Sequence, residues 1–595
     1  MRITKIGGSN INMPKKIVQL VTISVIHFTP WVPYAAGCLI SYCNRIPKIK
    51  ETIEFLEPLF QYKPIEEYDA VLAGVDVLGI TCYVWNQVYN DRLAKRFKEL
   101  NPNAIVVYGG PNIPEEQQIA TEFLNIRPYV DVMFVGPGEV NFSKWLLGNS
   151  TEGTVTRESF NVTNMREYQI RDTDMPTPYS DGIFDNIFLN TKLVKTPFET
   201  NRGCPYSCAF CDWGGQSRSK LRVFDLNQVK AQLDCIYQHK NITELELLDA
   251  NFGVLPRDVE IMQYMISLQE KHNNVIKLGY AGLAKNGSKN LPAILDLMSS
   301  SMKMDQRNQK LSFQTHTLQV LSNIDRDNID NSKLLNILEG CKRDGVLTTS
   351  ELIMALPGET AETWLETIVT NHKLGIDYIR TYILNYVPNT TMYTEKYRKQ
   401  FGVKSKKIRF PYAFNGLSYK KFHEDVNIVI NDFTDYEEYE LMIGTSSWNL
   451  EELVKMFDYT WWYHNMWNAG ALRPVVSDVK QEMITFFDNL DLMPFTKLLV
   501  EKNRTIIRNL FSYEPVSHIN DLATYLYYSK CLRTDEVYQI WNNKEKFAEE
   551  LSPFYGAEAM KFCIGEYCKE FSIKMYGADA TILKDKDAFL MRALK

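Results

Sequence analysis

The sequence has few cysteines for its length, and their distribution excludes a protein held together by disulfides. Eleven cysteines are scattered over 595 residues, and an odd number leaves at least one without a disulfide partner. Dense, paired cysteines are typical of secreted domains, whereas thiols stay reduced inside the cell. The first sixteen residues, MRITKIGGSNINMPKK, also lack the basic and apolar regions of a signal peptide. We therefore expect a cytoplasmic location.

An uninterrupted apolar run that would suit a membrane span is also missing. The uncharged run from Ile17 to Tyr42 is long enough to cross a bilayer. However, polar and helix-breaking residues interrupt it, among them Gln19, His27, Pro30 and Gly37. A buried strand, a loop containing proline and a helix fit this run better. We expect no membrane partner.

An excess of positive charge is absent as well. The net charge is −6 and the isoelectric point lies near 5.9, which gives no general attraction to nucleic acid. We therefore expect no nucleic-acid partner. The composition, with 45% hydrophobic and 23% charged residues, is that of a globular protein. A chain of 595 residues is too long for one hydrophobic core and should form three or four domains.

Residues 1–150 alternate between short apolar runs and charged helical segments. This alternation predicts an α/β domain with a parallel sheet covered on both faces. Ligands of such sheets bind at the carboxyl ends of the strands. Gly109, Gly110 and Gly136 follow two of the predicted strands, and Glu139 comes shortly after. Glycines there allow close approach of a ligand to the backbone, although such loops also occur as plain turns.

A polar segment, residues 151–190, is expected to be a surface linker because it is rich in Thr, Asp and Pro. A second alternating region, residues 191–400, should form a whole or partial parallel barrel. Residues 401–595 are richer in helical and aromatic stretches, which predict a helical C-terminal domain. The strands expected in the barrel are residues 193–200, 243–249, 275–282, 310–315, 350–358 and 377–387.

Three closely spaced cysteines directly follow the first strand of the predicted barrel. Cys204, Cys208 and Cys211 have a Cys-x3-Cys-x2-Cys spacing, and the next candidate ligands are Cys235 and His239. Structural zinc sites use four ligands, so zinc would need a ligand from elsewhere in the chain. Three thiolates on a cubane iron–sulfur cluster would leave one iron open for substrate or cofactor chemistry. Both possibilities place a metal site at the end of a barrel strand.

The loop 201-NRGCPYSCAFCDWGG-215 resembles the cluster loop of the radical S-adenosylmethionine enzymes. In that family three cysteines hold a 4Fe–4S cluster whose open iron binds the amino and carboxylate groups of S-adenosylmethionine. One electron then cleaves this cofactor to a 5′-deoxyadenosyl radical. The resemblance implies that Cys204, Cys208 and Cys211 are the iron ligands, and Phe210 matches the aromatic residue beside the adenine.

The resemblance continues along the predicted barrel in the expected order. The segment 249-DANFG-253 is similar to the acidic segment after the second strand, 312-SFQT-315 with Arg326 to the fourth-strand polar motif, and 356-LPGET-360 to the fifth-strand turn. It implies that Asp249, Gln314, Arg326 and Gly358 contact the cofactor. Asp249 alone could equally cap a turn, and Gln314 and Arg326 could be a buried polar pair. No Gly-Gly-Glu follows the second strand, so the group that binds the amine stays open.

A Rossmann-like domain before such a barrel resembles the cobalamin-binding subclass of this family. The matching segments are 30-PWVPYAAGCL-39, 74-GVDVLGITCYVWN-86, 106-VVYGGPN-112 and 131-DVMFVGPGEVNF-142. The resemblance implies cobalamin contacts at Gly109, Gly110, Gly136 and Glu139. No Asp-x-His-x-x-Gly occurs, so a histidine is missing where it would bind cobalt from below. A degenerate domain that binds nothing is the alternative.

The resemblance implies a cobalamin-dependent methyltransferase that acts on an unactivated carbon of a small molecule. Alternatives are a radical oxidation, cyclisation or rearrangement without cobalamin, or a non-catalytic iron–sulfur protein. A reducing partner such as flavodoxin or ferredoxin would supply electrons. Substrate selection is expected in the C-terminal domain and in loops such as 388-PNTTMY-393, so that a chain ending near residue 400 would keep its cluster. His464 is expected to be a hydrogen-bonded interior residue.

Overall fold

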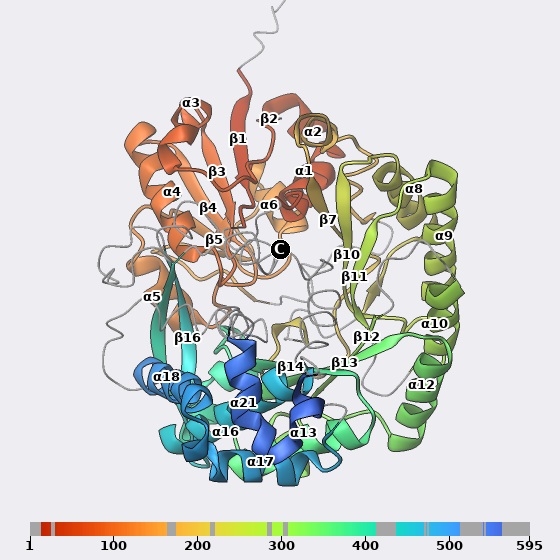
Figure 1. Cartoon of the computed structure of the whole chain (residues 1–595). Helices are drawn as coiled ribbons and strands as arrows, with labels where there is room; N and C mark the ends of the chain where they lie inside the picture. Colours follow the sequence, from red (N-terminus) through yellow and green to blue (C-terminus); the bar gives the residue numbers. More distant parts are fainter. Residues whose placement is uncertain are drawn as a thin grey trace, which may run out of the picture. The chain divides into compact units, whose positions relative to one another are not determined.

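The computed structural model describes residues 14–24, 30–163, 174–214, 221–282, 288–300, 308–411, 436–468, 472, 475–511, 540 and 543–561. The chain divides into two compact units (Figure 1). Unit 1 comprises Met1–Ser24, Trp31–Asn86 and Asn90–Thr191, and unit 2 comprises Val25–Pro30, Gln87–Tyr89 and Lys192–Lys595. Within the described ranges, none of the helices combines the length and apolar character needed to cross a bilayer.

Unit 1 is the α/β domain that the alternating pattern predicts. Its sheet has the order β2-β1-β3-β4-β5-β6, and all neighbours are parallel except the antiparallel pair β5 and β6. Its strands are β1 (Lys16–Val21), β2 (Ile53–Phe55), β3 (Val77–Thr81), β4 (Ile105–Gly109), β5 (Val132–Phe134) and β6 (Thr154–Val155). Its helices are α1 (Tyr34–Asn44), α2 (Pro47–Thr52), α3 (Asp69–Leu72), α4 (Gln87–Leu100), α5 (Gln117–Asn125), α6 (Glu139–Leu146) and α7 (Asp185–Asn190).

Both faces of this sheet are covered, as the apolar strands require. On one face, side chains of α1 and α6 form a buried cluster with Val18, Val77 and Val107. On the other face, the Tyr108 hydroxyl donates a 3.0 Å hydrogen bond to Asp91 of α4. The central strands are therefore buried on both sides, and their carboxyl ends are left to contact ligands.

The expected linker, residues 151–190, is in part packed into unit 1 and differs from the sequence prediction. Residues 164–173 of it lie outside the described part of the chain. Tyr179, Phe184 and Phe188 are buried, and the Tyr179 ring stacks on Tyr34 with centroids 5.9 Å apart. The polar composition of this segment predicted a surface linker, but three buried aromatic side chains are enough to anchor it to unit 1.

Unit 2 contains all six strands expected between residues 191 and 400. They form two three-stranded parallel sheets with the orders β11-β10-β7 and β12-β13-β14, and β11 lies next to β12. In Figure 1, α8, α9, α10 and α12 line the outer side of these strands. Among the described residues, hydrogen bonds do not join the two sheets into one barrel wall. The strands are β7 (Val194–Phe198), β10 (Ile242–Phe252), β11 (Lys277–Gly282), β12 (Asn308–Gln314), β13 (Leu347–Met354) and β14 (Tyr378–Ile383). The helices are α8 (Leu226–Tyr237), α9 (Arg257–His272), α10 (Leu291–Ser300), α11 (Leu318–Asn323), α12 (Asn331–Arg343) and α13 (Ala361–Lys373).

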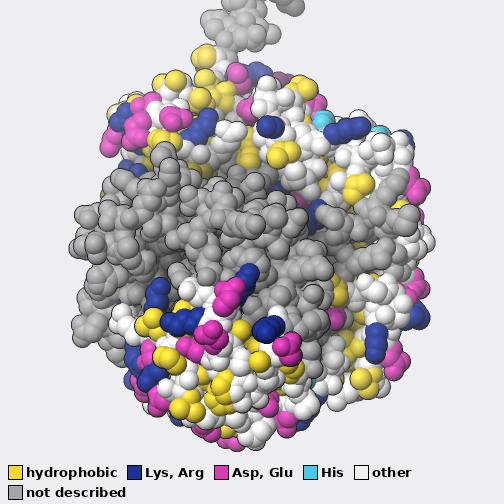
Figure 2. Space-filling view, in the orientation of Figure 1, with side chains coloured by type: hydrophobic (Ala, Val, Ile, Leu, Met, Phe, Trp, Pro, Cys, Tyr) yellow, Lys and Arg dark blue, Asp and Glu magenta, His cyan; other side chains and the backbone are white. Residues whose placement is uncertain are grey.

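The sequence predicted a helical C-terminal domain, but this region also contains two strands. The antiparallel pair β15 (Lys404–Pro411) and β16 (Tyr436–Gly444) precedes the helices. On the face shown in Figure 2, acidic and basic side chains are interspersed over the C-terminal helices. The remaining helical elements are α14 (Glu395–Phe401), α16 (Leu450–Trp462), the π-helical turn η7 (Tyr463–Asn468), α17 (Val479–Asp488), α18 (Pro494–Phe511) and α21 (Lys544–Tyr555).

The C-terminal helices share one hydrophobic core with the second parallel sheet. Trp364 of α13 is fully buried, and its indole N–H donates a 2.9 Å hydrogen bond to the Thr460 hydroxyl of α16. The same apolar cluster includes Leu352 of β13, Trp461 and Trp462. The predicted boundary near residue 400 therefore does not separate two cores.

His464 is a hydrogen-bonded interior residue, as expected. The Asn468 amide donates both to its Nδ1, at 2.8 Å, and to the Ile379 carbonyl. The Nε2 of His464 lies 3.0 Å from the Thr381 hydroxyl and therefore carries the proton. Burial lowers the pKa of His464 to about 3, so the ring is neutral. This network attaches the π-helical turn to the edge strand β14.

Candidate functional site

The cysteine loop is held in place at the carboxyl end of β7. The short antiparallel pair of β8 (Asn201–Arg202) and β9 (Arg222–Val223) brackets it. Within the loop, the Ala209 N–H donates to the Ile324 carbonyl at 2.9 Å, and the Ala209 carbonyl accepts from the Met392 N–H at 2.9 Å. The loop is therefore pinned between the segment after β12 and the 388–393 loop after β14.

Each of the three thiols in this loop has its own N–H donor. The Asn251 amide donates to Cys204 Sγ at 3.4 Å, and the Arg326 guanidinium donates to Cys208 Sγ at 3.6 Å. The backbone N–H of Trp213 donates to Cys211. Cys204 and Cys208 are 8% exposed, and Cys211 is half-buried.

The three thiols lie close enough for the charges of Cys204 and Cys208 to affect the pKa of Cys211. Burial, opposed by the Trp213 N–H and reinforced by the nearby Cys208 and Cys204, raises the pKa of Cys211 to about 11. Among the residues that the structure describes, no group of three or more His, Cys, Asp or Glu side chains is arranged so that it could hold a single metal ion. A cluster differs from a single ion because its thiolates bind different irons. The buried thiols and their N–H donors suit thiolate ligands of such a cluster.

Asp249 supports the cysteine loop from beneath. Its carboxylate accepts from the backbone N–H of Thr200 at 2.7 Å, from that of Asn201 at 3.3 Å and from the Asn201 amide at 2.8 Å, and it also accepts from the Thr200 hydroxyl. The side chain is fully buried within β10, and burial raises its pKa to about 7. These contacts favour the turn-fixing alternative over direct contact with a cofactor.

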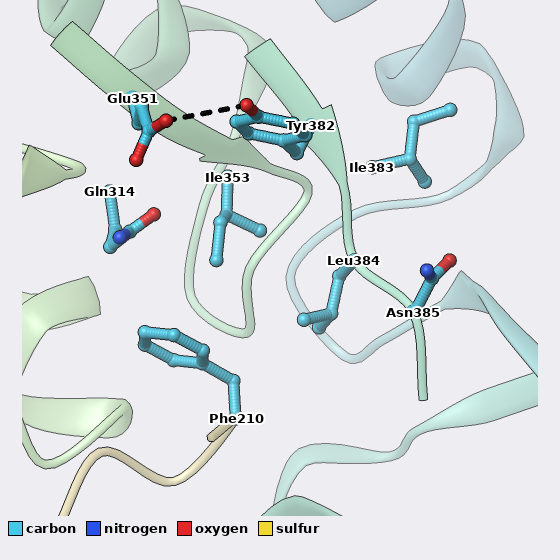
Figure 3. Close-up of a pocket in the computed structure, with 8 residues that line it drawn as sticks. All are labelled: Phe210, Gln314, Glu351, Ile353, Tyr382, Ile383, Leu384 and Asn385. Atoms are coloured by element: carbon cyan, nitrogen blue, oxygen red, sulfur yellow. Dashed lines mark hydrogen bonds between the residues drawn. The ribbon is translucent and has the colours of Figure 1, made fainter. Parts of the chain in front are cut away.

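A cavity of about 280 Å³ opens beside the cysteine loop, over the ends of β12, β13 and β14 (Figure 3). It brings together Phe210 and Gln314, two of the residues singled out in the sequence. Gln314 has a φ of 69°, a left-handed conformation that non-glycine residues adopt at a cost. The lining residues are Phe210, Gln314, Glu351, Ile353, Tyr382, Ile383, Leu384 and Asn385.

Glu351 and Tyr382 are polar cavity residues that the sequence reasoning missed. The Glu351 carboxylate accepts a 2.7 Å hydrogen bond from the Ser312 hydroxyl and a 3.4 Å bond from Tyr382 (Figure 3). The available signal was one acidic residue inside the otherwise uncharged strand segment 350-SELIM-354. Asn251 was also missed, because β10 extends to Phe252, beyond the strand expected at residues 243–249, and an amide after that expected strand is an ordinary turn residue.

Gly358 lies in the turn after β13 and does not line the cavity. It has a φ of 95°, and a Cβ there would lie 2.3 Å from the Asn323 amide nitrogen. The neighbouring Glu359 is fully buried and accepts from the N–H groups of Ala355, at 2.8 Å, and Leu356, at 3.3 Å. The turn motif therefore shapes the backbone after β13.

Glu359 is expected to make the protein less stable as the pH rises. Burial raises its pKa to about 8 from an unfolded value of 4.5, so the folded state binds the extra proton between these values. The free energy of unfolding should therefore fall from pH 4.5 to 8, by at most about 1.4 kcal/mol per pH unit from this group. In chemical denaturation, Glu359→Gln should flatten this slope. The control Glu339→Gln, at an exposed position of α12, should leave it unchanged. Equal slopes in all three proteins would contradict the prediction.

The predicted ligand contacts of unit 1 lie after neighbouring parallel strands. Gly109 ends β4 and Gly110 follows it, whereas Gly136 and Glu139 follow β5. Gly110 has a φ of 104° and Gly136 a φ of 76°. Glu139 is 4% exposed in the first turn of α6. A second cavity of about 320 Å³ in this unit is lined by none of these four residues.

The two adjacent glycines should respond differently to alanine. A Cβ at Gly110 would lie 2.8 Å from the Cys82 carbonyl oxygen, and its φ is positive. The nearest atom to a Cβ at Gly109 is the Phe134 Cβ at 4.0 Å. Gly110→Ala should therefore destabilise unit 1 by roughly 1–3 kcal/mol or more, whereas Gly109→Ala should cost little. Calorimetric unfolding of the full chain would measure both. Equal losses would show that the turn adapts.

Comparison with known proteins shows which enzymes this chain resembles. A scan against family models finds no match. The chain is 31% identical over 392 residues to the cobalamin-dependent radical SAM methyltransferase TokK of Streptomyces tokunonensis. The alignment covers 63% of this chain and 56% of TokK. It is 30% identical over 395 residues to the 2-(S-pantetheinyl)-carbapenam-3-carboxylate methyltransferase of Streptantibioticus cattleyicolor. That alignment covers 64% of this chain and 57% of the methyltransferase. The chain is therefore similar in sequence to two methyltransferases, one of which is a cobalamin-dependent radical SAM enzyme.

The alignments span a little over half the length of these two relatives. Among solved structures, the radical enzyme OxsB with aqua-cobalamin and S-adenosylmethionine bound is similar with a TM-score of 0.49 and 14% identity, over 93% of this chain and 84% of OxsB. The methyltransferase TsrM from Kitasatospora setae, with cobalamin and a [4Fe-4S] cluster bound, has a TM-score of 0.47 and 16% identity, over 64% of this chain and 74% of TsrM. The radical SAM homology thus rests on the sequence matches.

Proposed function

We propose that this chain is a cobalamin-dependent radical S-adenosylmethionine methyltransferase acting on an unactivated carbon of a small molecule. The observation that carries the proposal is the loop at the end of β7, where three neighbouring thiols each have an N–H donor. Cys204, Cys208 and Cys211 would hold a 4Fe–4S cluster. The two methyltransferases named above, to which the chain is similar, support the reaction class. We propose a small molecule as the substrate and do not specify it further.

The residues around the cavity would orient S-adenosylmethionine beside the cluster. Phe210 lies one position before Cys211 and lines the cavity, so its ring can pack against the adenine. Gln314, Glu351 and Tyr382 offer hydrogen-bonding groups on the opposite wall. The apolar Ile353 and Leu384 would exclude water from the bound cofactor. Gly358 and Asp249 would act indirectly, by shaping the turn after β13 and the cysteine loop.

Unit 1 is proposed to bind cobalamin at the ends of β4 and β5. Gly110 and Gly136 have positive φ values in the turns after these strands, a conformation that glycine adopts readily. Glu139 would help to shape the same end of the sheet. When bound, the cobalamin and the cluster with S-adenosylmethionine would supply a methyl group and a radical initiator. A reducing partner such as flavodoxin or ferredoxin would supply the electrons.

Product analysis of the reconstituted protein tests the reaction class. After anaerobic reconstitution with iron, sulfide and hydroxocobalamin, dithionite-reduced protein should convert S-adenosylmethionine to 5′-deoxyadenosine, or to S-adenosylhomocysteine if the methyl transfer is polar. A corrinoid absorbance that survives gel filtration at one equivalent supports the methyltransferase. 5′-Deoxyadenosine without retained corrinoid would instead indicate a radical oxidation, cyclisation or rearrangement. Neither product from a fully loaded cluster would leave a non-catalytic iron–sulfur protein.

A further inference from the structure

The three sulfur atoms of the cysteine loop receive hydrogen bonds from three separate parts of unit 2. Asn251 comes from β10, Arg326 from the segment after α11, and Trp213 from the loop itself. Two of the donors are side chains, so they can be removed by substitution without changing the cysteines. The Trp213 donor is a backbone group and stays in every variant.

Arg326 is held by the protein in the orientation that reaches the sulfur. Its Nε donates to the Asn328 side chain at 3.1 Å, its second terminal nitrogen donates to the Ser312 carbonyl, and Nη1 donates to Cys208. Each of its three nitrogens therefore has a protein acceptor. The Ser207 hydroxyl donates to Asp325 at 2.5 Å, which ties the cysteine loop to the residue before Arg326. Such a prearranged donor keeps its place when the charge on its acceptor changes.

Hydrogen bonds and positive charge at cluster sulfurs favour the reduced state. Reduction adds one negative charge to the cluster, and part of that charge resides on the thiolates. A guanidinium beside Cys208 and an amide beside Cys204 stabilise this added charge in a half-buried, low-dielectric setting. They stabilise the oxidised cluster less, because it carries less negative charge.

We propose that Arg326 and Asn251 raise the reduction potential of the cluster held by Cys204, Cys208 and Cys211. This inference rests on the proposed function, since it requires the cluster. It assigns both side chains a positioning and tuning role through the thiolates. Arg326 thereby sets how strong a reducing partner the protein requires.

The test is an anaerobic redox titration of the reconstituted full chain. The electron paramagnetic resonance signal of the reduced cluster measures the fraction reduced at each potential. Asn251→Leu removes the amide donor at similar size, Arg326→Gln removes the cation, and Arg326→Lys keeps the charge but loses the planar geometry. Each of Asn251→Leu and Arg326→Gln should make reduction about tenfold less favourable, which is a shift of about 59 mV to lower potential. Arg326→Lys should shift it less than Arg326→Gln does.

The control is Arg343→Gln, which also removes one positive charge from unit 2 but at an exposed position of α12 paired with Asp344. Its potential should equal that of the wild type. Iron and sulfide analysis separates the two levels of failure. A wild type that binds no cluster overturns the proposed function, whereas variants with full clusters and unchanged potentials overturn this inference alone. If Arg326→Gln loads no cluster, Asn251→Leu and Arg326→Lys decide the question.

Discussion

Replacing Cys204, Cys208 and Cys211 together by alanine is expected to abolish cluster binding and every trace of S-adenosylmethionine cleavage. The loop offers three neighbouring thiols, each with an N–H donor, and thiolates are the ligands that iron–sulfur clusters use. Without them the loop contains no thiolate to bind the irons. Turnover should fall by at least about 10³-fold, to the background of the assay, because no electron can reach the cofactor.

Iron and sulfide analysis after anaerobic reconstitution measures the first loss, and detection of 5′-deoxyadenosine measures the second. Cys235→Ala is the matched control, since Cys235 is a half-buried cysteine of α8 near in sequence to the loop. It should keep full iron content and activity. Circular dichroism should show that the triple variant stays folded, because the loop is also held by the Ala209 backbone hydrogen bonds. Equal iron in the wild type and the triple variant would contradict the prediction.

A chain that ends at residue 400 is expected to lose the folded structure of unit 2. The sequence suggested that such a chain would keep its cluster, but the shared core changes this expectation. Truncation would expose Trp364, Leu352 and their neighbours, which pack with Trp461 and Trp462 in one buried cluster. Each large apolar side chain contributes about 1.5–3 kcal/mol on burial, and several such losses exceed the roughly 5–15 kcal/mol stability of a folded domain.

Solubility, limited proteolysis and cooperative unfolding of the 1–400 chain measure this loss. Co-expression of residues 401–595 as a separate chain is the control, because it can restore the core without restoring the covalent link. A soluble 1–400 chain that unfolds cooperatively and binds a full cluster would contradict the prediction. Because truncation confounds folding with specificity, loss of turnover in the 1–400 chain would not by itself locate substrate selection.

Local patterns in the sequence were sufficient for the six strands between residues 191 and 400 and for the position of the cysteine loop. The six strands expected between residues 191 and 400 correspond to β7 and β10 to β14. In the middle of β10 the burial of successive side chains alternates, which is the period that a strand imposes. The spacing of Cys204, Cys208 and Cys211 keeps the three cysteines within one short loop, which the sequence alone places after a predicted strand. Gly110 after a predicted strand likewise occupies a left-handed turn that its residue type permits.

The roles of single polar residues and the boundaries of the cores depended on the tertiary structure. Asp249 holds Thr200 and Asn201, which lie some fifty positions away, and Glu351 reaches the cavity beside Phe210 only because β13 follows β12 in the sheet. The core that joins Trp364 to Trp461, and the aromatic anchor at Tyr179, join segments that local composition assigns to different domains. A carboxylate or an aromatic ring looks the same in the sequence whether it faces a cofactor, a loop or a core. Only the long-range packing decides which partner it meets.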